Sequence, residues 1–246
     1  MSKEITNYQG IIYLTFGNQD AGVFSSYVTD VCKHLESEYS GDVKVVSFVS
    51  MRGFFNTRKR RKSLYSKTIV LPMFPKFRYW KMNQLTLAFF WLFIGRKKVI
   101  ALSPIAANLG LFLKKLGLVK TVIYDAEGAT WAEWNEYDVV GDPKMVHNIK
   151  EIESRAVNQS DHNRTVSKKM MEYWQREFGY TGEKPTIIPC TLNSVFIQNV
   201  SSEQKIKELR AEWGFTENDV VFVYSGSTAA WQSFDLVDET FTKLLA

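Results

Sequence analysis

Apolar runs of strand length alternate along this chain with segments of helical period. The runs are rich in β-branched and aromatic residues, and turn residues separate them from the helical segments. The predicted strands cover residues 11–17, 43–49, 68–74, 97–103, 121–124, 162–167 and 186–190. Strands that alternate with helices are typical of the α/β class, so the pattern predicts a parallel sheet flanked by helices.

The helical segments follow the strands with recognisable start and stop signals. Pro104 stands at a first turn and Gly117 after a last turn, which is the usual asymmetry of helix ends. The basic segment 52–67 is predicted as a long exposed loop. Later in the chain, an amphipathic helix over 205–215 precedes a predicted strand at 219–227, and a further helix follows that strand. The remaining predicted helices cover residues 23–35, 82–94, 104–117, 143–160 and 167–179.

Charge is distributed unevenly between the two halves. No Asp or Glu occurs between Asp42 and Asp125. Residues 1–120 carry a net charge of +13 and residues 121–246 carry −8, within a total of +5. An asymmetry of this size concerns partners rather than fold. One half is therefore expected to face a nucleic acid, an acidic membrane surface or a phosphorylated small molecule.

Aromatic residues alternate with basic ones just before the most apolar stretch, residues 85–94, in which Thr86 is the one polar residue. Ten residues are too few to span a bilayer, which takes about 20. The stretch is predicted either as a buried helix or as an interfacial anchor beside anionic lipid. No nucleic-acid-binding signature accompanies it, so a membrane partner is favoured and nucleic acid is not expected. The predicted membrane and acceptor surface comprises Arg58, Lys59, Arg60, Arg61, Lys62, Lys76, Arg78, Trp80 and Lys81.

Composition narrows the class of protein. The 246 residues are 45% hydrophobic, which suffices for one large or two small domains. Cys32 and Cys190 fit no metal or redox spacing, so no metal site and a reducing compartment are predicted. The N-terminus has no apolar segment of the secretory type, and we expect a cytoplasmic protein peripheral to the inner face of the membrane.

Short motifs gather in the second half of the chain. Their order resembles the interdomain region of family 4 glycosyltransferases with the GT-B fold, in element order over 1–246 and in motif detail over 120–232. The matching residues are Glu153, Arg155, Asp161, Val166, Ser167, Ile188, Pro189, Cys190, Phe196, Arg210, Trp213, Gly214, Tyr224, Ser225, Gly226 and Ser227.

This resemblance implies a Rossmann-like acceptor domain over 1–198, and a linker helix with the first unit of a donor domain over 199–246. It implies a nucleotide-sugar donor as substrate, with no separate cofactor. The implied acceptor is a glycan or a polyprenyl-diphosphate-linked sugar in cell-surface polysaccharide synthesis.

Two sets of site residues follow. Asp125, Glu127 and Glu133 come at the end of the fifth strand, where open parallel sheets bind ligands, and they are expected to face the cleft as catalytic groups. They act as a base in an inverting enzyme or orient hydroxyls in a retaining one. The donor phosphates are expected at two glycine turns, through Gly17, Asn18, Gly22, Ser225, Gly226 and Ser227.

Departures from the family pattern keep alternatives open. Asn193 stands where the family often has Asp, and the turn at 225–232 has no Lys or Arg. The family's acidic segment, which holds the donor sugar, is expected beyond residue 246. The sequence thus fits a fragment, a relic or half of a split enzyme, and also a non-catalytic module that binds a membrane or a partner.

Overall fold

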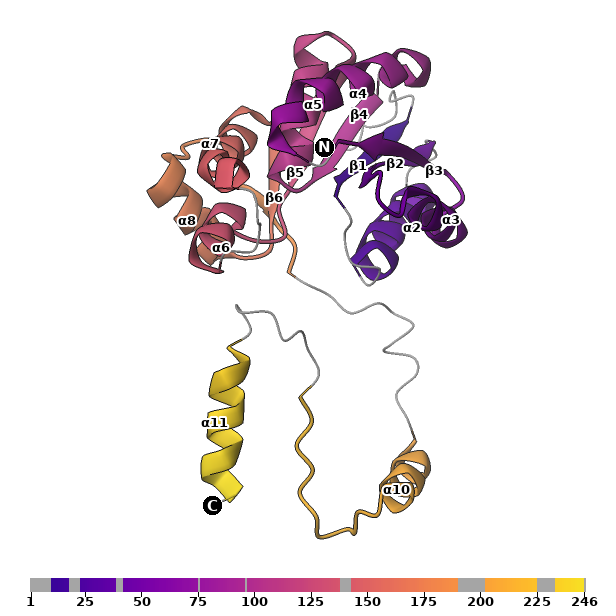
Figure 1. Cartoon of the computed structure of the whole chain (residues 1–246), viewed down its shortest axis with the longest axis vertical. Coiled ribbons are helices and arrows are strands. Elements are labelled where there is room, and N and C mark those ends of the chain that lie inside the picture. The colour runs from indigo at the N-terminus through magenta and orange to yellow at the C-terminus, as the bar shows by residue number, and fades with distance from the viewer. Residues whose placement is uncertain are drawn as a thin grey trace. The chain divides into compact units, whose positions relative to one another are not determined.

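A computed structural model describes residues 10–17, 23–38, 42–74, 76–95, 97–137, 143–189, 202–224 and 233–245 (Figure 1). The chain divides into two compact units, Met1–Thr191 and Leu192–Ala246. Each unit is described by itself below.

Unit 1 is built on a seven-stranded sheet in which each pair of neighbouring strands runs parallel. The spatial order is β3-β2-β1-β4-β5-β6-β7, so the chain builds outward from β1 on one side and from β4 on the other. This arrangement confirms the predicted α/β class and is Rossmann-like. The strands are β1 (Ile11–Phe16), β2 (Val43–Ser50), β3 (Thr68–Met73), β4 (Lys97–Leu102), β5 (Val119–Asp125), β6 (His162–Thr165) and β7 (Thr186–Ile187).

Helices cover both faces of the sheet, as Figure 1 shows for α2 and α3 on one side and α4 and α5 on the other. A short π-helix, η2, leads directly into α2, and a 3-10 turn, η3, leads into α4. The elements are η2 (Phe24–Val28), α2 (Thr29–Glu38), α3 (Phe54–Leu64), η3 (Phe77–Tyr79), α4 (Trp80–Ile94), α5 (Pro104–Lys115), α6 (Thr130–Tyr137), α7 (Pro143–Gln159) and α8 (Lys168–Phe178).

Alternation along β1 divides the core between the two faces. Tyr13 packs with Phe24 and Val28 beneath the helix that follows β1. Ile12 and Leu14 point the other way, into a larger cluster that includes Leu87 and Trp91 of α4 and much of α5. Because successive side chains of a strand point to opposite faces, one apolar strand supplies both layers.

Local signals in the sequence explain how α5 and α8 begin. Ser103 accepts a hydrogen bond from the Ala106 backbone N–H at 3.4 Å, and Ser167 accepts one from Met170 at 3.2 Å, so each serine caps a helix. Gly110 allows α5 to approach β5 closely, since a Cβ atom there would lie 3.2 Å from Val122.

Two sequence predictions are wrong in the fold. Residues 52–67 are not one long loop, because 54–64 form α3. This helix buries Arg61 in place of an apolar stripe, so hydrophobic periodicity gave no sign of it. Residues 219–224 are not assigned to a strand, and the described part of the chain offers them no pairing strand. Residues 225–227 lie outside the described ranges.

Unit 2 contains the predicted amphipathic helix as α10 (Glu203–Glu212), and a second helix, α11 (Phe234–Leu245). Ser202 caps α10 by accepting a hydrogen bond from Lys205 at 3.3 Å. Ring contacts join residues 219–224 to α11. The ring centroids are 5.3 Å apart for Phe222 and Phe241 and 5.2 Å apart for Tyr224 and Phe234.

Candidate functional site

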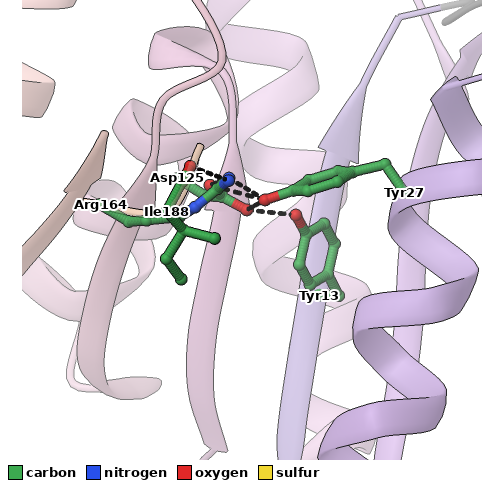
Figure 2. Close-up of polar contacts among 5 residues, drawn as sticks. All are labelled: Tyr13, Tyr27, Asp125, Arg164 and Ile188. Carbon is green, nitrogen blue, oxygen red and sulfur yellow. Dashed lines mark hydrogen bonds and ion pairs between the residues drawn. The ribbon is translucent and has the colours of Figure 1, made fainter. Parts of the chain in front are cut away.

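A buried polar network joins β1, β5 and β6 near their carboxyl ends (Figure 2). Its centre is the carboxylate of Asp125, the last residue of β5, which is 2% exposed. The Tyr13 hydroxyl donates a hydrogen bond to this carboxylate, and the Tyr27 hydroxyl donates at 2.9 and 3.2 Å. Arg164 forms an ion pair with Asp125 and donates to the Tyr27 hydroxyl and, at 3.0 Å, to the Ile188 carbonyl.

The expectation that Asp125 faces the cleft is wrong, because three partner side chains enclose its carboxylate. Burial raises the pKa of Asp125 to about 7, against the hydrogen bond from Tyr13, which favours the ionised form. The guanidinium of Arg164 is in direct contact and favours the ionised form as well, so we assign a charged pair at neutral pH. The network therefore fastens three strands, η2 and the segment after β7 together.

Glu127 and Glu133 lie just beyond this network, on the loop after β5 and on the first turn of α6. Glu127 is exposed overall, whereas Glu133 is half-buried. Desolvation, with the charges of Asp125 and Glu133, raises the pKa of Glu127 to about 7. Burial raises the pKa of Glu133 as well. The Glu133 carboxyl lies close over Gly128, where an added Cβ atom would collide with it.

Glu153 on α7 is a further carboxyl of this region, and its side chain is fully buried. It accepts a hydrogen bond from the Trp131 backbone N–H at 2.6 Å and so holds the first turn of α6. Its second oxygen, Oε1, has no hydrogen-bond partner among the described residues. Burial raises the pKa of Glu153 to about 7, against hydrogen bonds from the backbone of Trp131 and Thr130. Glu153 thereby anchors the helix that follows the loop carrying Glu127.

The turn after β1 is described up to Gly17, which has a φ of 94° and open space at its Cβ position. The side chain of Arg61 lies beneath this turn and donates to the Gly17 carbonyl at 3.1 Å. Arg61 is 3% exposed, so its assignment to a membrane surface is wrong. The other residues predicted to hold phosphate, Asn18, Gly22, Ser225, Gly226 and Ser227, lie outside the described ranges.

The predicted basic and aromatic surface over 52–98 is divided by the sheet. Helix α3 packs on the face that holds Tyr13, whereas α4 packs on the opposite face. Trp80 is half-buried, with its ring 6.0 Å from that of Phe16. The exposed cations among the predicted surface residues are Arg58, Lys59, Arg60 and Lys62 on α3, and Lys76, Arg78 and Lys81 beside and on α4.

Helix α4 is neither fully buried nor polar on its outer face. Its inner side chains, Leu87 and Trp91, are completely buried. Its outer face presents Met82, Leu85, Phe89, Phe90, Leu92 and Phe93, and Phe93 is 78% exposed. We call these six residues the α4 apolar face. An exposed apolar patch of this kind marks an interaction surface.

A pocket of about 310 Å³ opens elsewhere, beside β5, β6 and β7. Its lining includes Ile123, His162, Tyr180 and Thr186, and it includes neither Glu127 nor Glu133. Within the described ranges, no group of three or more His, Cys, Asp or Glu side chains is placed to hold a metal ion. The same part of the chain has no helix with the length and apolar character needed to cross a bilayer.

Sequence reasoning missed the partners that determine the state of Asp125. Tyr13, Tyr27 and Arg164 are separated from it by 112, 98 and 39 residues. The parallel order of strands was the available signal, since Arg164 pairs with Asp125 in the register of β5 and β6. Glu153 was singled out only as part of the family resemblance, and nothing in the sequence indicated its contact with the start of α6.

No protein-family model matches the chain, and no curated protein matches it. Among solved structures, the chain is similar to a putative UDP-N-acetylglucosamine 2-epimerase from Listeria monocytogenes, with 13% sequence identity and a TM-score of 0.49. The match covers 72% of this chain and 43% of the epimerase chain. The chain thus spans less than half the length of that enzyme.

Proposed function

We propose that this chain forms the acceptor-side part of a nucleotide-sugar-dependent glycosyltransferase that builds a cell-surface polysaccharide. One observation carries the proposal: acidic side chains with raised pKa values gather where β5 ends, beside β4, and the sheet reverses its order between β4 and β1. In open α/β sheets ligands bind at this edge and at this reversal. The sequence motifs that resemble family 4 glycosyltransferases agree with it.

Glu127 is the acid–base group of the proposed reaction. A carboxyl with a pKa of about 7 is suited to accept a proton near neutral pH. As the acceptor oxygen bonds to the anomeric carbon, Glu127 takes the hydroxyl proton. The bond from that carbon to the diphosphate oxygen breaks, and the nucleoside diphosphate leaves with the electron pair. Glu133 orients the acceptor hydroxyl, and Glu153 anchors the helix that follows the loop. In a retaining enzyme both glutamates would only orient hydroxyls.

The α4 apolar face supports a membrane-bound acceptor. Exposed Lys76, Arg78 and Lys81 accompany it, and no acidic residue occurs in this part of the sequence. Aromatic and apolar side chains enter the interfacial region of a bilayer, while cations near the surface each add about 1 kcal/mol with anionic lipid. Trp80, at the start of α4, contacts Phe16 at the end of β1, so this surface adjoins the carboxyl edge of the sheet.

Turnover by the purified chain tests the proposal. The chain is incubated with uridine and guanosine diphosphate sugars and with vesicles that carry polyprenyl diphosphate sugars, and released nucleoside diphosphate is measured. Glu127→Gln is expected to lower the rate by about 100-fold or more. Glu136→Gln, an exposed change on α6, is the matched control and is expected to leave the rate unchanged. Equal rates for the two variants would contradict the assignment of Glu127.

A second candidate is a non-catalytic membrane-binding module, which the α4 apolar face favours. It predicts sedimentation with phosphatidylglycerol vesicles and no release of nucleoside diphosphate. The double change Phe89→Ser and Phe93→Ser is expected to weaken vesicle binding by about tenfold or more. Phe55→Ser is the matched control, because Phe55 is 79% exposed but lies on α3, across the sheet. Equal binding to neutral and anionic vesicles would rule out the charge contribution.

A further inference from the structure

The pocket beside β5, β6 and β7 takes no part in the mechanism above. It has a volume of about 310 Å³, which is at the lower end of the range for small-molecule sites. Its lining comes from β5, the end of α7, the turn at 160–161, the start of β6 and the segment 180–186 that leads into β7. From α7 to β7 these parts belong to the range 143–189, which is described without a gap.

The pocket lies at the edge of the sheet opposite the candidate site. Ser160 and Asp161 precede the first residue of β6, and Lys184 precedes β7. Because the strands are parallel, these positions lie at the amino ends of the strands, whereas Glu127 and Glu133 follow the carboxyl end of β5. A molecule bound in the pocket therefore does not occupy the reaction centre proposed above.

Internal contacts hold the walls of the pocket in place. The Asp161 carboxylate accepts a hydrogen bond from the Val122 backbone N–H at 2.8 Å and pairs with Lys114 at 2.5 Å. On the segment before β7, the Tyr180 hydroxyl donates to the Glu183 carbonyl at 2.5 Å. The walls are thus ordered before a ligand binds, which lowers the entropic cost of binding.

Two asparagines turn their side-chain oxygens away from the contacts that hold them. The Asn163 amide nitrogen donates to the Val157 carbonyl at 2.7 Å, and Asn158 donates to Phe178 in the same way at 3.1 Å. Since a backbone carbonyl only accepts, each amide directs its nitrogen toward that carbonyl and its oxygen elsewhere. Asn163 is 6% exposed, and its oxygen has no hydrogen-bond partner among the described residues. The Ser160 hydroxyl is likewise buried without a partner among them.

These groups indicate the chemistry of a ligand. Buried polar groups usually have partners, so a polar molecule in the pocket accounts for the unpaired oxygens. The asparagine oxygens need hydrogen-bond donors, which ionised phosphate and carboxylate groups lack. The charged lining residues balance, two acidic and two basic: Asp161, Glu183, Arg164 and Lys184. A neutral molecule with several hydroxyl groups meets both conditions, and Ile123 in the lining offers apolar contact to its C–H groups.

We propose that this pocket binds one sugar unit of a glycan. Sugar hydroxyls both donate and accept, so one ring can satisfy the asparagine oxygens and the Ser160 hydroxyl together. The inference goes beyond the proposed function, because a glycan held at this edge of the sheet is bound without being transformed. A second attachment point raises the effective concentration of a glycan at the protein.

Methyl glycosides of glucose, galactose, mannose and N-acetylglucosamine are the probes, because the methyl group stands in for the rest of a glycan. Binding to the full chain is measured by changes in amide chemical shifts. It is expected in the millimolar range, since each hydrogen bond to the sugar replaces one to water. The expected shifts include those of Asn158, Ser160, Asn163 and Lys184. Absence of shifts at these residues with all four probes would overturn the proposal.

A variant that fills the pocket tests its location. Thr186→Trp enlarges an exposed side chain of β7 in the pocket lining and is expected to weaken sugar binding by about tenfold or more. Thr181→Trp is the matched control, because Thr181 is exposed on the same segment but does not line the pocket. It is expected to leave binding unchanged. Equal sugar binding by the two variants would overturn the proposal.

Ser160→Ala tests the hydrogen bonds without filling the pocket. The Ser160 oxygen has no partner among the described residues, so its removal is expected to preserve the Tm and to weaken sugar binding by about two- to tenfold. Gln159→Ala changes an exposed neighbour outside the lining and is expected to preserve both quantities. Unweakened sugar binding by Ser160→Ala would contradict the assignment of this hydroxyl to the ligand.

Inorganic phosphate and the transfer assay separate the remaining outcomes. Phosphate is expected to leave the pocket amides unshifted, and phosphate-dependent shifts that Thr186→Trp removes would overturn the proposal in favour of an anion site. Sugar binding in the pocket without release of nucleoside diphosphate would support the pocket and contradict the glycosyltransferase. Release of nucleoside diphosphate without sugar-dependent shifts in the pocket would do the reverse.

Discussion

Arg164 and Arg61 are both buried on the same face of one sheet, yet only Arg164 contacts a carboxylate among the described residues. The register of β1, β4, β5 and β6 places Thr15, which Arg61 contacts, on the same face as Asp125 and Arg164. Arg164 contacts the Asp125 carboxylate directly. Arg61 contacts a backbone carbonyl and a hydroxyl. One cation is neutralised inside the chain, and the other is not neutralised by any described residue.

The two arginines should therefore differ in what they contribute to stability. A neutralised pair such as Asp125 and Arg164 fastens elements that are distant in sequence, and its removal leaves one buried charge without a partner. A buried cation with only uncharged partners contributes less to the stability of the protein, because its burial is costly. Glu153 is the acidic counterpart of Arg61, since backbone N–H groups hold it and no cation among the described residues pairs with it.

The largest loss of stability is expected when Arg164, the arginine that is paired with Asp125, is replaced. Arg164→Met leaves the Asp125 carboxylate buried without its cation and is expected to lower the free energy of unfolding by about 3–5 kcal/mol near pH 8. Urea denaturation measures this loss. Arg176→Met, on the exposed side of α8, is the control and is expected to change stability by less than about 0.5 kcal/mol.

The pH dependence of that loss sharpens the test. Without Arg164, the pKa of Asp125 rises further, because the cation that favoured its ionised form is gone while its burial remains. The variant then regains stability as the pH falls below the raised pKa, since the neutral acid tolerates burial. A loss that is the same at pH 5 and pH 8 would show that Arg164 acts through packing rather than through its charge.

The second effect concerns Glu153, whose folded pKa of about 7 lies above its ordinary value of 4.5. The folded protein holds this proton to higher pH than the unfolded chain does. The raised pKa contributes about 3 kcal/mol to the free energy of unfolding. This contribution is fully present below pH 4.5 and is lost as the pH rises through about 7. Glu153→Gln cannot titrate but keeps an oxygen for the Trp131 N–H. It is expected to flatten the decline in unfolding free energy between pH 5 and pH 8.

The control for Glu153 is Glu151→Gln, which changes an exposed carboxyl on the same helix and is expected to preserve the wild-type pH profile. Asp125→Asn distinguishes the effect of Asp125 from that of Glu153, because it also disrupts the ion pair with Arg164. It is expected to destabilise the protein at every pH rather than to flatten the profile. A pH profile of Glu153→Gln identical to that of the wild type would place the titrating group elsewhere.

The smallest change in stability is expected when Arg61, which has only uncharged partners among the described residues, is replaced. Arg61→Met loses two hydrogen bonds but also removes a poorly compensated charge, so the free energy of unfolding is expected to change by no more than about 1 kcal/mol. The measurement is urea denaturation in a buffer free of phosphate and sulfate. A loss as large as that of Arg164→Met would remove the distinction between the two arginines.

Much of the fold follows from short-range patterns in the sequence. Each strand predicted between residues 11 and 190 corresponds to a strand of the parallel sheet. Most of these segments are apolar because central strands are buried on both faces, whereas β6 (His162–Thr165) is polar. Helix α3 escaped prediction because five of its eleven residues are Lys or Arg and its inner face buries a guanidinium. The extended segment 219–224 has strand composition, but a strand also needs a partner for its hydrogen bonds.

The candidate site was predicted less completely. The position of Glu127 and Glu133 at the end of β5 follows from the strand pattern, since sequence order fixes which residues end a strand. The enclosure of Asp125 does not follow from that pattern, because its partners come from β1, η2 and β6. The sequence likewise did not show that, in the basic run 58–62, four cations are exposed while Arg61 is buried.

The sequence by itself determined the α/β class, the location of the acids at a strand end and the excess of positive charge before them. These features depend on residue type and on local periodicity, both of which are fully present in the amino-acid sequence. The tertiary structure alone decided which charges are neutralised. Pairing is a matter of distance in space, and the sheet brings Arg164 onto Asp125 while leaving Arg61 beneath the turn after β1.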